Sequence, residues 1–331
     1  MLMPELIHAI ETDKVTSLTE EHLNQDFSEA ELKAFSNAVK LNSSINNIEL
    51  SNISINNIIL ELLGGALPFN DSVKSLKLIN ISNLKDVIPE LQEVIQFNTA
   101  IEQLVITETQ GADEVLGHIG QYLAKNVRIK ELCLTHNVLK EAGFDAIATI
   151  ISNNKTLTSI DISHQKINSN NMIAIAASIA TNKTLKSFYL NETGLKSSAI
   201  TYLSAALTEN EALTTLQMAN NNFNGHMLLP LVDALEERHV LENINLSHAN
   251  IDKYFAVEFA KTFAANGQFK LLDLSNNKIE DLGATVIARY AKDHKSLAEL
   301  NLSGNNLTEL GIFLVKDALK ENQDIVRLQK D

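Results

Sequence analysis

Apolar and polar residues alternate along this chain in a unit that recurs at a fixed spacing. Residues 271 to 282, LLDLSNNKIEDL, show an alternating apolar run that ends at two asparagines, with an apolar residue two positions further on. Residues 157 to 167, LTSIDISHQKI, and residues 297 to 307, LAELNLSGNNL, share this frame. With the first apolar residue of each copy as position 1, the copies begin 28 residues apart at Ile45, Val73, Ile101, Ile129, Leu157, Leu185, Leu213, Leu241, Phe269, Leu297 and Ile325.

Each unit predicts one strand followed by one helix. Positions 1, 4 and 6 are apolar, as in Leu157, Ile160 and Ile162, which is typical of a strand with one buried face. Positions 16, 19, 20 and 23 follow the spacing of an amphipathic helix. A repeated strand and helix predict a solenoid with a parallel sheet on one side and helices on the other. Because strands pair about 4.8 Å apart and helices pack about 8 to 10 Å apart, we expect the sheet on the concave face.

The frame L-x-x-L-x-L-x-x-N-x-L, followed by a helical stretch, resembles the leucine-rich repeat family. The spacing of 28 residues resembles the ribonuclease-inhibitor-like subclass of that family, and the resemblance covers residues 45 to 328. It implies an α/β horseshoe solenoid with a concave parallel sheet and convex helices. We predict a single domain over residues 1–331, made of a helical cap (1–44), ten 28-residue repeats (45–324) and a partial terminal repeat (325–331).

Asparagine recurs at two positions of the repeat, position 9 and position 26, and we call each set of equivalent residues a column. Position 26 lies just after the helix, where asparagine tolerates the left-handed backbone that ends many helices. The resemblance implies that asparagine at position 9 bonds the backbone of adjacent turns, but Ile53, Ile81 and Thr109 occupy this position in the first three copies, where we expect different bonding. The position-26 asparagines are Asn42, Asn70, Asn98, Asn126, Asn154, Asn182, Asn210, Asn266 and Asn322, and those at position 9 are Asn137, Asn221, Asn277 and Asn305.

Both ends of the chain differ from the repeats. A short helix, PELIHAI, precedes a unit that keeps its helix but loses its regular strand, because Ser17, Glu20 and His22 replace the apolar anchors. Ser28 and Glu31 have the spacing of a capping box at the start of that helix. At the other end, residues 325 to 328 begin a strand that stops almost at once, and charged residues 330 and 331 blunt its edge.

Composition limits the classes of binding partner and the cellular compartment of the protein. With 45% hydrophobic residues and no long apolar run, the chain predicts no membrane insertion. The single cysteine, Cys133, and the absence of a secretory signal in MLMPELIHAIETDK favour a cytoplasmic protein. A net charge of −14 disfavours nucleic acid and anionic membranes, and it favours either a basic protein surface as partner or simply solubility.

Function must come from side chains that point out of the sheet, because the repeat itself builds a scaffold. These stand at positions 2, 3, 5, 7 and 8, and the central copies gather acid, histidine and one tyrosine there. We predict partner-binding residues on the concave face at Glu108, His136, Asp161, His164, Tyr189, Glu192, Gln217, Asn245 and His248.

Metal binding and catalysis have weaker support. The row Glu108, His136, His164 and Glu192 has three interpretations: a shared divalent metal, a pH-dependent partner contact, or a solvated polar wall. The last is favoured, since stacked turns gather any such row. Cys133 near His136 is conceivable as a thiol nucleophile, but an ordinary cysteine fits better in an open sheet without an oxyanion donor. No phosphate loop, nucleophile elbow or zinc motif is present, so we predict no catalytic residues, metal or cofactor.

The favoured hypothesis is a non-enzymatic protein-binding module. Its few arginines and its lysine, isoleucine and asparagine usage resemble the leucine-rich repeat effectors that intracellular bacterial pathogens deliver into host cells. The alternative is a GTPase activator, since activators of the small GTPase Ran resemble this chain in repeat type, length and acidity. The long acidic tail of those activators is missing, and their arginine finger would have to be Arg128 or Arg238. A sensing segment of a larger receptor is a third hypothesis, against which the cap and initiating methionine count.

Overall fold

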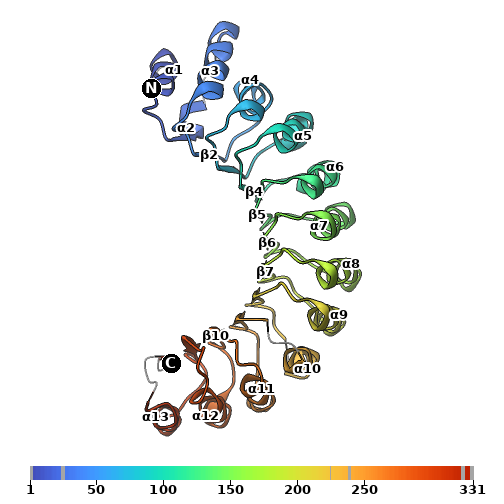
Figure 1. Ribbon diagram of the computed structural model, residues 1–331, viewed down its shortest axis with the longest axis vertical. Coiled ribbons are helices and arrows are strands. Elements are labelled where there is room, and N and C mark those ends of the chain that lie inside the picture. The colour runs from blue at the N-terminus through green and yellow to red at the C-terminus, as the bar shows by residue number, and fades with distance from the viewer. Residues whose placement is uncertain (1–2, 24–26, 224, 238–239, 322–324, 329–331) are drawn as a thin grey trace. The chain divides into compact units, whose positions relative to one another are not determined.

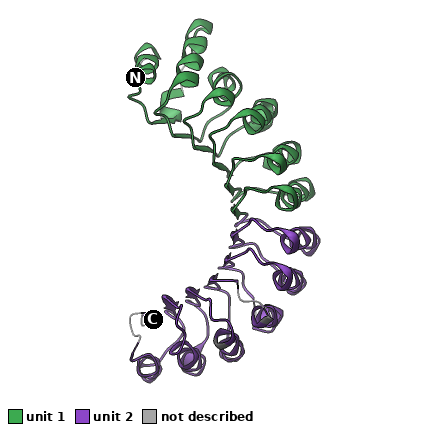
Figure 2. Cartoon of the chain, viewed as in Figure 1, with its two compact units in different colours: residues 1–161 green, residues 162–331 purple. Residues whose placement is uncertain are grey.

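The computed structural model describes residues 3–23, 27–223, 225–237, 240–321 and 325–328 (Figure 1). The chain divides into two compact units, residues 1–161 and residues 162–331 (Figure 2). Both units repeat the same order of strand, connection and helix. None of the described helices combines the length and the apolar character that a membrane span requires.

Unit 1 (residues 1–161) contains the strands β1 to β6, which pair side by side in parallel and in chain order. From β2 on, each residue pairs with the residue 28 positions later, as Leu76 pairs with Leu104. The elements are α1 Met3–Glu11, β1 Ser17–Thr19, α2 Glu20–Leu23, α3 Glu29–Leu41, β2 Asn47–Ser51, α4 Asn57–Leu60, the π-helix η1 Glu61–Ala66, the 3-10 helices η2 Leu67–Phe69 and η3 Leu84–Val87, β3 Ser75–Ile79, α5 Ile88–Phe97, β4 Gln103–Thr107, α6 Ala112–Lys125, β5 Glu131–Cys133, α7 Glu141–Asn153 and β6 Ser159–Asp161.

Unit 2 (residues 162–331) continues the repeat with strands β7 to β12, again parallel and in chain order. The same 28-residue register pairs Leu216 with Ile244. The elements are α8 Ser169–Thr181, β7 Ser187–Tyr189, α9 Ser197–Glu209, β8 Thr215–Gln217, the 3-10 helix η4 Gly225–Leu228, α10 Leu229–Glu237, β9 Asn243–Asn245, α11 Lys253–Ala265, β10 Leu271–Asp273, α12 Glu280–Ala291, β11 Glu299–Asn301, α13 Glu309–Ala318 and β12 Val326–Arg327.

The core of each unit lies between its strands and its helices. Position 4 in the strands, such as Ile160 and Leu216, is buried, as is position 19 in the helices, such as Ile147 and Leu203. The residues beside position 4 are partly exposed in strands such as β6 and β8 and exposed at Glu131 in β5, so one face of the sheet points away from the helices. The predicted α/β repeat, with parallel strands on one side and helices on the other, is confirmed within each unit. That residues 1–331 form a single domain stays a prediction.

The position-26 asparagines end the helices in a different way from the one predicted. Asn98 has extended backbone, with φ −66° and ψ 134°, and the other described members of the column are extended too, so the predicted left-handed conformation is wrong. The side chain explains the residue type instead. Its Oδ1 accepts from the N–H groups of Ala100 and Ile101, while its Nδ2 donates to the carbonyls of Leu67 and Asn70 in the preceding turn. A side-chain amide can donate two hydrogen bonds and accept two at one buried point, whereas a hydroxyl or a neutral imidazole has only one N–H or O–H to donate.

His294 replaces asparagine at position 26 and keeps part of this function. Its Nε2 lies 2.8 Å from the carbonyl oxygen of Asn266, 28 residues earlier, and must donate because a carbonyl only accepts. The ring also stacks on Phe263, with centroids 4.7 Å apart, in an aromatic cluster that includes Phe269. The other exception, Arg238, and the last member, Asn322, lie outside the described residues.

The position-9 asparagines bond adjacent turns, as the family resemblance implied. Asn137 Nδ2 donates to the carbonyls of Ile106 and Leu134, and its Oδ1 accepts from Thr109 N. The first three copies, which lack this asparagine, are bonded differently, as expected: β2, β3 and β4 each extend to five residues, against three in β5. In those turns Ser82 N donates to Ile53 O, so backbone pairing continues where the asparagine would stand.

The N-terminal cap contains a strand, β1, although the sequence predicts that this unit loses its regular strand. The predicted first helix is confirmed as α1, and Ser28 and Glu31 form the capping box. Strand β1, however, pairs with β2 at an offset of 30 residues, Ser17 with Asn47, which brings Leu18 rather than Glu20 into the buried position. At the other end, the short strand β12 is confirmed against β11. Residues 330 and 331 lie outside the described part of the chain.

Replacing Asn154 by alanine should destabilise unit 1. Asn154 is buried and makes four bonds to backbone groups, to Leu123 O, Asn126 O, Thr156 N and Leu157 N. Their loss leaves buried polar groups unsatisfied, and we expect the free energy of unfolding in urea to fall by at least about 2 kcal/mol.

The neighbouring Asn153 is the matched control, because it is exposed and its Nδ2 donates to Thr149 O within the same helix. Asn153→Ala should change the free energy of unfolding by no more than about 0.5 kcal/mol. Equal effects of the two substitutions would contradict a structural role for the position-26 column.

Candidate functional site

The outward-facing row at position 8 has one backbone conformation in every repeat. These residues have φ between +50° and +65°, the left-handed region that costs an ordinary residue about 1 to 2 kcal/mol. Asparagine, histidine and glycine tolerate it best, which accounts for most of the row. Its members are Asn52, Asn80, Glu108, His136, His164, Glu192, Asn220, His248, Asn276 and Gly304.

This finding changes the interpretation of the histidines. Sequence reasoning treated acid and histidine at position 8 as candidate chemistry, whereas the backbone alone favours histidine there. Glu108 and Glu192 are the members that the left-handed backbone does not favour. The signal that would have revealed the conformation was the recurrence of asparagine, histidine and glycine in one column.

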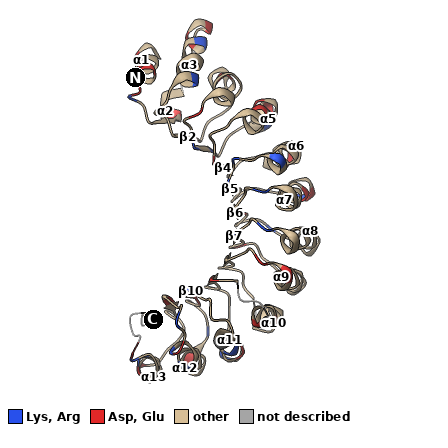
Figure 3. Ribbon diagram, viewed as in Figure 1, with Lys and Arg blue, Asp and Glu red and all other residues tan. Residues whose placement is uncertain are grey.

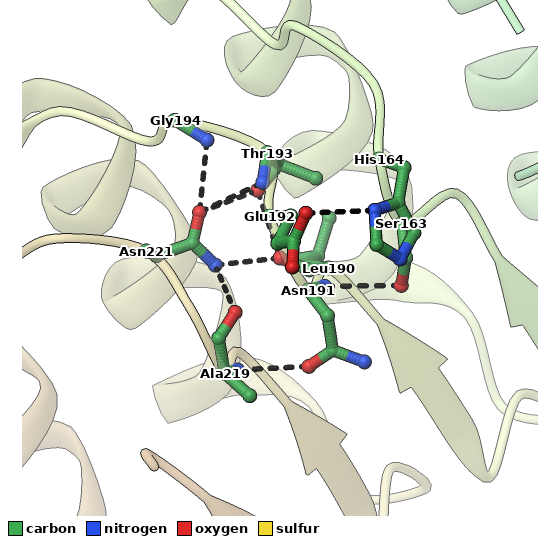
Figure 4. Close-up of polar contacts among 9 residues, drawn as sticks. All are labelled: Ser163, His164, Leu190, Asn191, Glu192, Thr193, Gly194, Ala219 and Asn221. Atoms are coloured by element: carbon green, nitrogen blue, oxygen red, sulfur yellow. Dashed lines mark hydrogen bonds and ion pairs between the residues drawn. The ribbon is translucent and has the colours of Figure 1, made fainter. Parts of the chain in front are cut away.

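In unit 2, His164 and Glu192 form an ion pair across neighbouring turns (Figure 4). His164 Nδ1 lies 3.0 Å from Glu192 Oε2, and both side chains are partly exposed. The pair is charged only when the imidazole is protonated, and a partly exposed pair contributes about 0 to 1 kcal/mol. The pair therefore contributes little to the stability of the fold, but it places two polar groups side by side on the outward face.

Asparagine side chains fix the backbone around this pair. Asn221 Oδ1 accepts from the N–H groups of Thr193 and Gly194, and its Nδ2 donates to Leu190 O, so the turn that carries Glu192 is tied at both ends (Figure 4). Asn191 Oδ1 in turn accepts from Ala219 N at 2.8 Å. The backbone groups of Leu190, Thr193, Gly194 and Ala219 around this pair are thus hydrogen-bonded.

The position-5 candidates follow one another along the strands of unit 2. Tyr189 pairs in register with Gln217, and Gln217 with Asn245. All three side chains are partly exposed, and His248 is exposed at the next position-8 site. Unit 2 therefore gathers His164, Tyr189, Glu192, Gln217, Asn245 and His248 on one face.

Unit 1 holds the remaining candidates, Glu108, His136 and Asp161. Asp161 pairs in register with Cys133 and is partly exposed, whereas Glu108 and His136 are exposed. The predicted row of Glu108, His136, His164 and Glu192 is thus shared between the units, two residues in each. Within the described residues, no three histidine, cysteine, aspartate or glutamate side chains form a group that could hold a metal ion.

The candidate catalytic groups show no activation. Burial raises the pKa of the Cys133 thiol, and the nearby Asp161 carboxylate raises it further, so the thiol is protonated at neutral pH. Arg128 is exposed in the loop between α6 and β5, before the strand rather than after it. Arg238 lies outside the described residues.

Sequence reasoning missed a set of ion pairs between successive turns. Glu49 with Lys77, Glu102 with Lys130, Glu242 with Lys270, and Glu299 with Arg327 each join residues 28 positions apart, with N–O distances of 2.8 to 3.0 Å. The signal was available, because the repeat places residue i beside residue i+28. These pairs occupy positions 2, 3 and 5, so they neutralise part of the outward face.

The repeat geometry defines the class of each unit as a leucine-rich-repeat-like solenoid. No protein-family model matches the chain, and no curated protein matches it. Among solved structures, the chain resembles the actin-binding site 2 of leiomodin-1, with 17% identity and a TM-score of 0.38 over 55% of this chain and 90% of that one. It also resembles the tropomodulin C-terminal domain from Caenorhabditis elegans, with 12% identity and a TM-score of 0.39 over 47% of this chain and 93% of that one.

Glycine and valine at position 108 should act in opposite directions on stability. Glu108 has φ +55°, is exposed and forms no side-chain hydrogen bond with described residues, so a substitution there tests the backbone alone. Glu108→Gly should raise the free energy of unfolding by up to about 1 kcal/mol, and Glu108→Val should lower it by about 1 kcal/mol or more.

Gln110 in the same turn provides the control, because it is exposed and does not have positive φ. Gln110→Gly should lower the free energy of unfolding by up to about 1 kcal/mol. A stabilising effect at both positions in a urea titration would contradict the left-handed assignment.

Proposed function

We propose that the chain is a non-enzymatic protein-binding module that holds a target protein against the outward face of its strands. The observation that carries this proposal is the row of Tyr189, Gln217 and Asn245, which follow one another in register with partly exposed side chains. The His164–Glu192 pair stands beside them. An extended open row of aromatic and polar groups suits a protein surface, whereas small molecules are usually enclosed in pockets.

The backbone behind this face supports tight binding. Asn221 satisfies the turn at Thr193 and Gly194, and Asn277 does the same for Ala249 and Ile251 further along unit 2. A surface whose backbone is already fixed loses less conformational entropy when it binds. Tyrosine is enriched at the energetic centres of interfaces, which makes Tyr189 the expected anchor.

Charge and composition support a particular kind of target. A net charge of −14 favours a partner with a basic surface. Four of the 27 lysines and arginines are arginine, a usage that resembles leucine-rich repeat effectors of intracellular bacterial pathogens. On this proposal the chain belongs to the ribonuclease-inhibitor-like subclass, enters a host cell through a specialised secretion system, and binds a host protein in the cytosol.

The alternative of a GTPase activator has no supporting observation among the described residues. An arginine finger has to reach the nucleotide of a bound GTPase. Arg128 lies between a helix end and the start of β5, away from the position-8 face that follows the strands. The protonated Cys133 thiol likewise supports no nucleophilic mechanism.

A triple variant of the outward face should lose the partner. We propose affinity capture from host-cell and bacterial lysates with the native chain and with Asp161→Lys, His164→Ala and Tyr189→Ala combined, followed by mass spectrometry. All three side chains are partly exposed, so we expect the variant to fold, with an unchanged circular dichroism spectrum, and to retain less than about a tenth of the captured partner.

The matched control places the same substitutions on exposed helical positions: Asp145→Lys, His118→Ala and Tyr202→Ala. This control should capture the partner as the native chain does. Equal capture by the outward-face variant would exclude that face as the binding site. Faster GTP hydrolysis by a captured small GTPase would replace the binding-module proposal with the activator alternative.

A further inference from the structure

Unit 1 exposes large apolar side chains along the edge where its helices end. Leu41, Phe69 and Phe97 occupy position 25 in three successive turns, and 82%, 60% and 54% of their surfaces are exposed. Val127, in the following turn, is 68% exposed. Position 25 is lysine in that turn and asparagine in the next, so the apolar row stops there. We call the part formed by residues 95–99, 121–128 and 149–155 the helix-end groove.

The helix-end groove contains two adjoining hollows. The first, of about 410 Å³, lies between the ends of α5 and α6, with Phe97 and Tyr122 in its wall. The second, of about 470 Å³, lies between the ends of α6 and α7 and reaches Thr149 and Asn153. Val127 lines both hollows and so forms a shared apolar ridge. A bulky apolar side chain beside this ridge would gain contacts that Phe97 and Val127 now lack.

The charge of the helix-end groove opposes that of the whole chain. Lys125 and Arg128 line the first hollow, Lys125 and Lys155 line the second, and no acidic residue lines either. Among the described residues, neither Lys125 nor Arg128 forms an ion pair. Glu102 is attracted by Arg128, but its carboxylate is held by Lys130 Nζ at 2.9 Å. On a chain with net charge −14, a wholly basic groove favours an acidic ligand.

Helix dipoles account for these cations only in part. Helix C-termini carry partial negative charge, which favours lysine in the last turn. Lys125 lies in the last turn of α6 and Lys40 in that of α3, whereas α7, α8, α9 and α11, which are also followed by position-26 asparagines, have no basic residue there. Moreover, Asn126 Nδ2 already donates to Ile95 O, and Asn154 Nδ2 donates to Leu123 O. Lys155 Nζ also donates to Ser152 O in the last turn of α7, at 3.4 Å, but an ammonium group has three N–H donors, so it can still pair with a ligand as Lys125 and Arg128 can.

We propose that the helix-end groove binds an acidic peptide segment of a partner protein through one bulky apolar residue. The apolar side chain lies between Phe97 and Val127, and flanking carboxylates pair with Lys125, Arg128 and Lys155. This surface is separate from the outward face of the strands, so it adds a second contact with opposite charge preference. The proposed function does not depend on it.

The test uses the full chain and a short fluorescein-labelled peptide in which a Leu-Phe pair is flanked by aspartates and glutamates. Fluorescence anisotropy should show saturable binding that weakens as sodium chloride rises, because salt screens exposed ion pairs. A peptide with lysine for every acid, and one with serine for both apolar residues, should each bind at least about tenfold more weakly.

Paired variants locate the peptide on the chain. Lys125→Glu with Arg128→Glu should weaken binding at least about tenfold, because repulsion replaces attraction. The matched control, Lys85→Glu with Lys140→Glu, makes the same change in charge at exposed residues of the opposite edge of unit 1 and should leave affinity unchanged. Val127→Ser should also weaken binding, whereas Val138→Ser, at an exposed valine on that opposite edge, should not.

Several outcomes would overturn this proposal. Equal binding of the acidic and lysine peptides, or equal loss in the two pairs of charge variants, would show nonspecific attraction. Failure of the acidic peptide to bind, together with self-association of the chain that Lys125→Glu and Arg128→Glu abolish, would assign the groove to a second copy. The triple variant of the outward face should bind the acidic peptide normally, so failure of the proposed function is distinguished from failure of this one.

Discussion

A buried side-chain amide that follows most of the repeat helices is the interaction on which the rest of the structure depends. At Asn98, Asn154 and Asn210 the amide accepts from two N–H groups that lead into the next strand and donates to two carbonyls of the preceding turn. The bonds reach back 28 and 31 residues, so an insertion between two such asparagines would separate donors from acceptors. A constant repeat length therefore follows from hydrogen bonding, and hydrophobic burial fixes which faces turn inward.

The same constraint shapes the functional surface. Because each turn has the same length, equivalent residues stack on neighbouring strands, and one backbone conformation recurs at position 8. A residue at position 8 has to tolerate left-handed backbone and also has to be stable with its side chain exposed to solvent. Histidine and asparagine meet both, whereas Glu108 and Glu192 meet only the second. Glutamate is disfavoured at positive φ, so its presence there is a stronger sign of function than the presence of histidine, which tolerates that backbone.

The sequence predicted the architecture well because its signals are periodic. Apolar spacing located the strands and helices, and the family resemblance implied the bonds of the position-9 asparagines. It failed where an asparagine has two possible roles: backbone tolerance and side-chain bonding give the same residue type at position 26 but different φ. It also failed at β1, where a two-residue shift of register brings Leu18 into the core and hides the strand from a strict 28-residue frame. The candidate site was located only as a row, because pairs such as His164 with Glu192 depend on rotamers that periodicity does not specify.

The outward face of the strands and the helix-end groove differ in how far their charges are paired. On the sheet side, lysines are matched to glutamates 28 residues away, as at Glu49 with Lys77, so much of the positive charge there is already neutralised. At the helix ends of unit 1, Lys125 and Arg128 have no such match among the described residues. Figure 3 shows both charge signs distributed over the helices and loops of each unit. Electrostatic steering acts through unmatched charge, so an acidic protein with one locally basic edge can orient a partner before short-range contacts form.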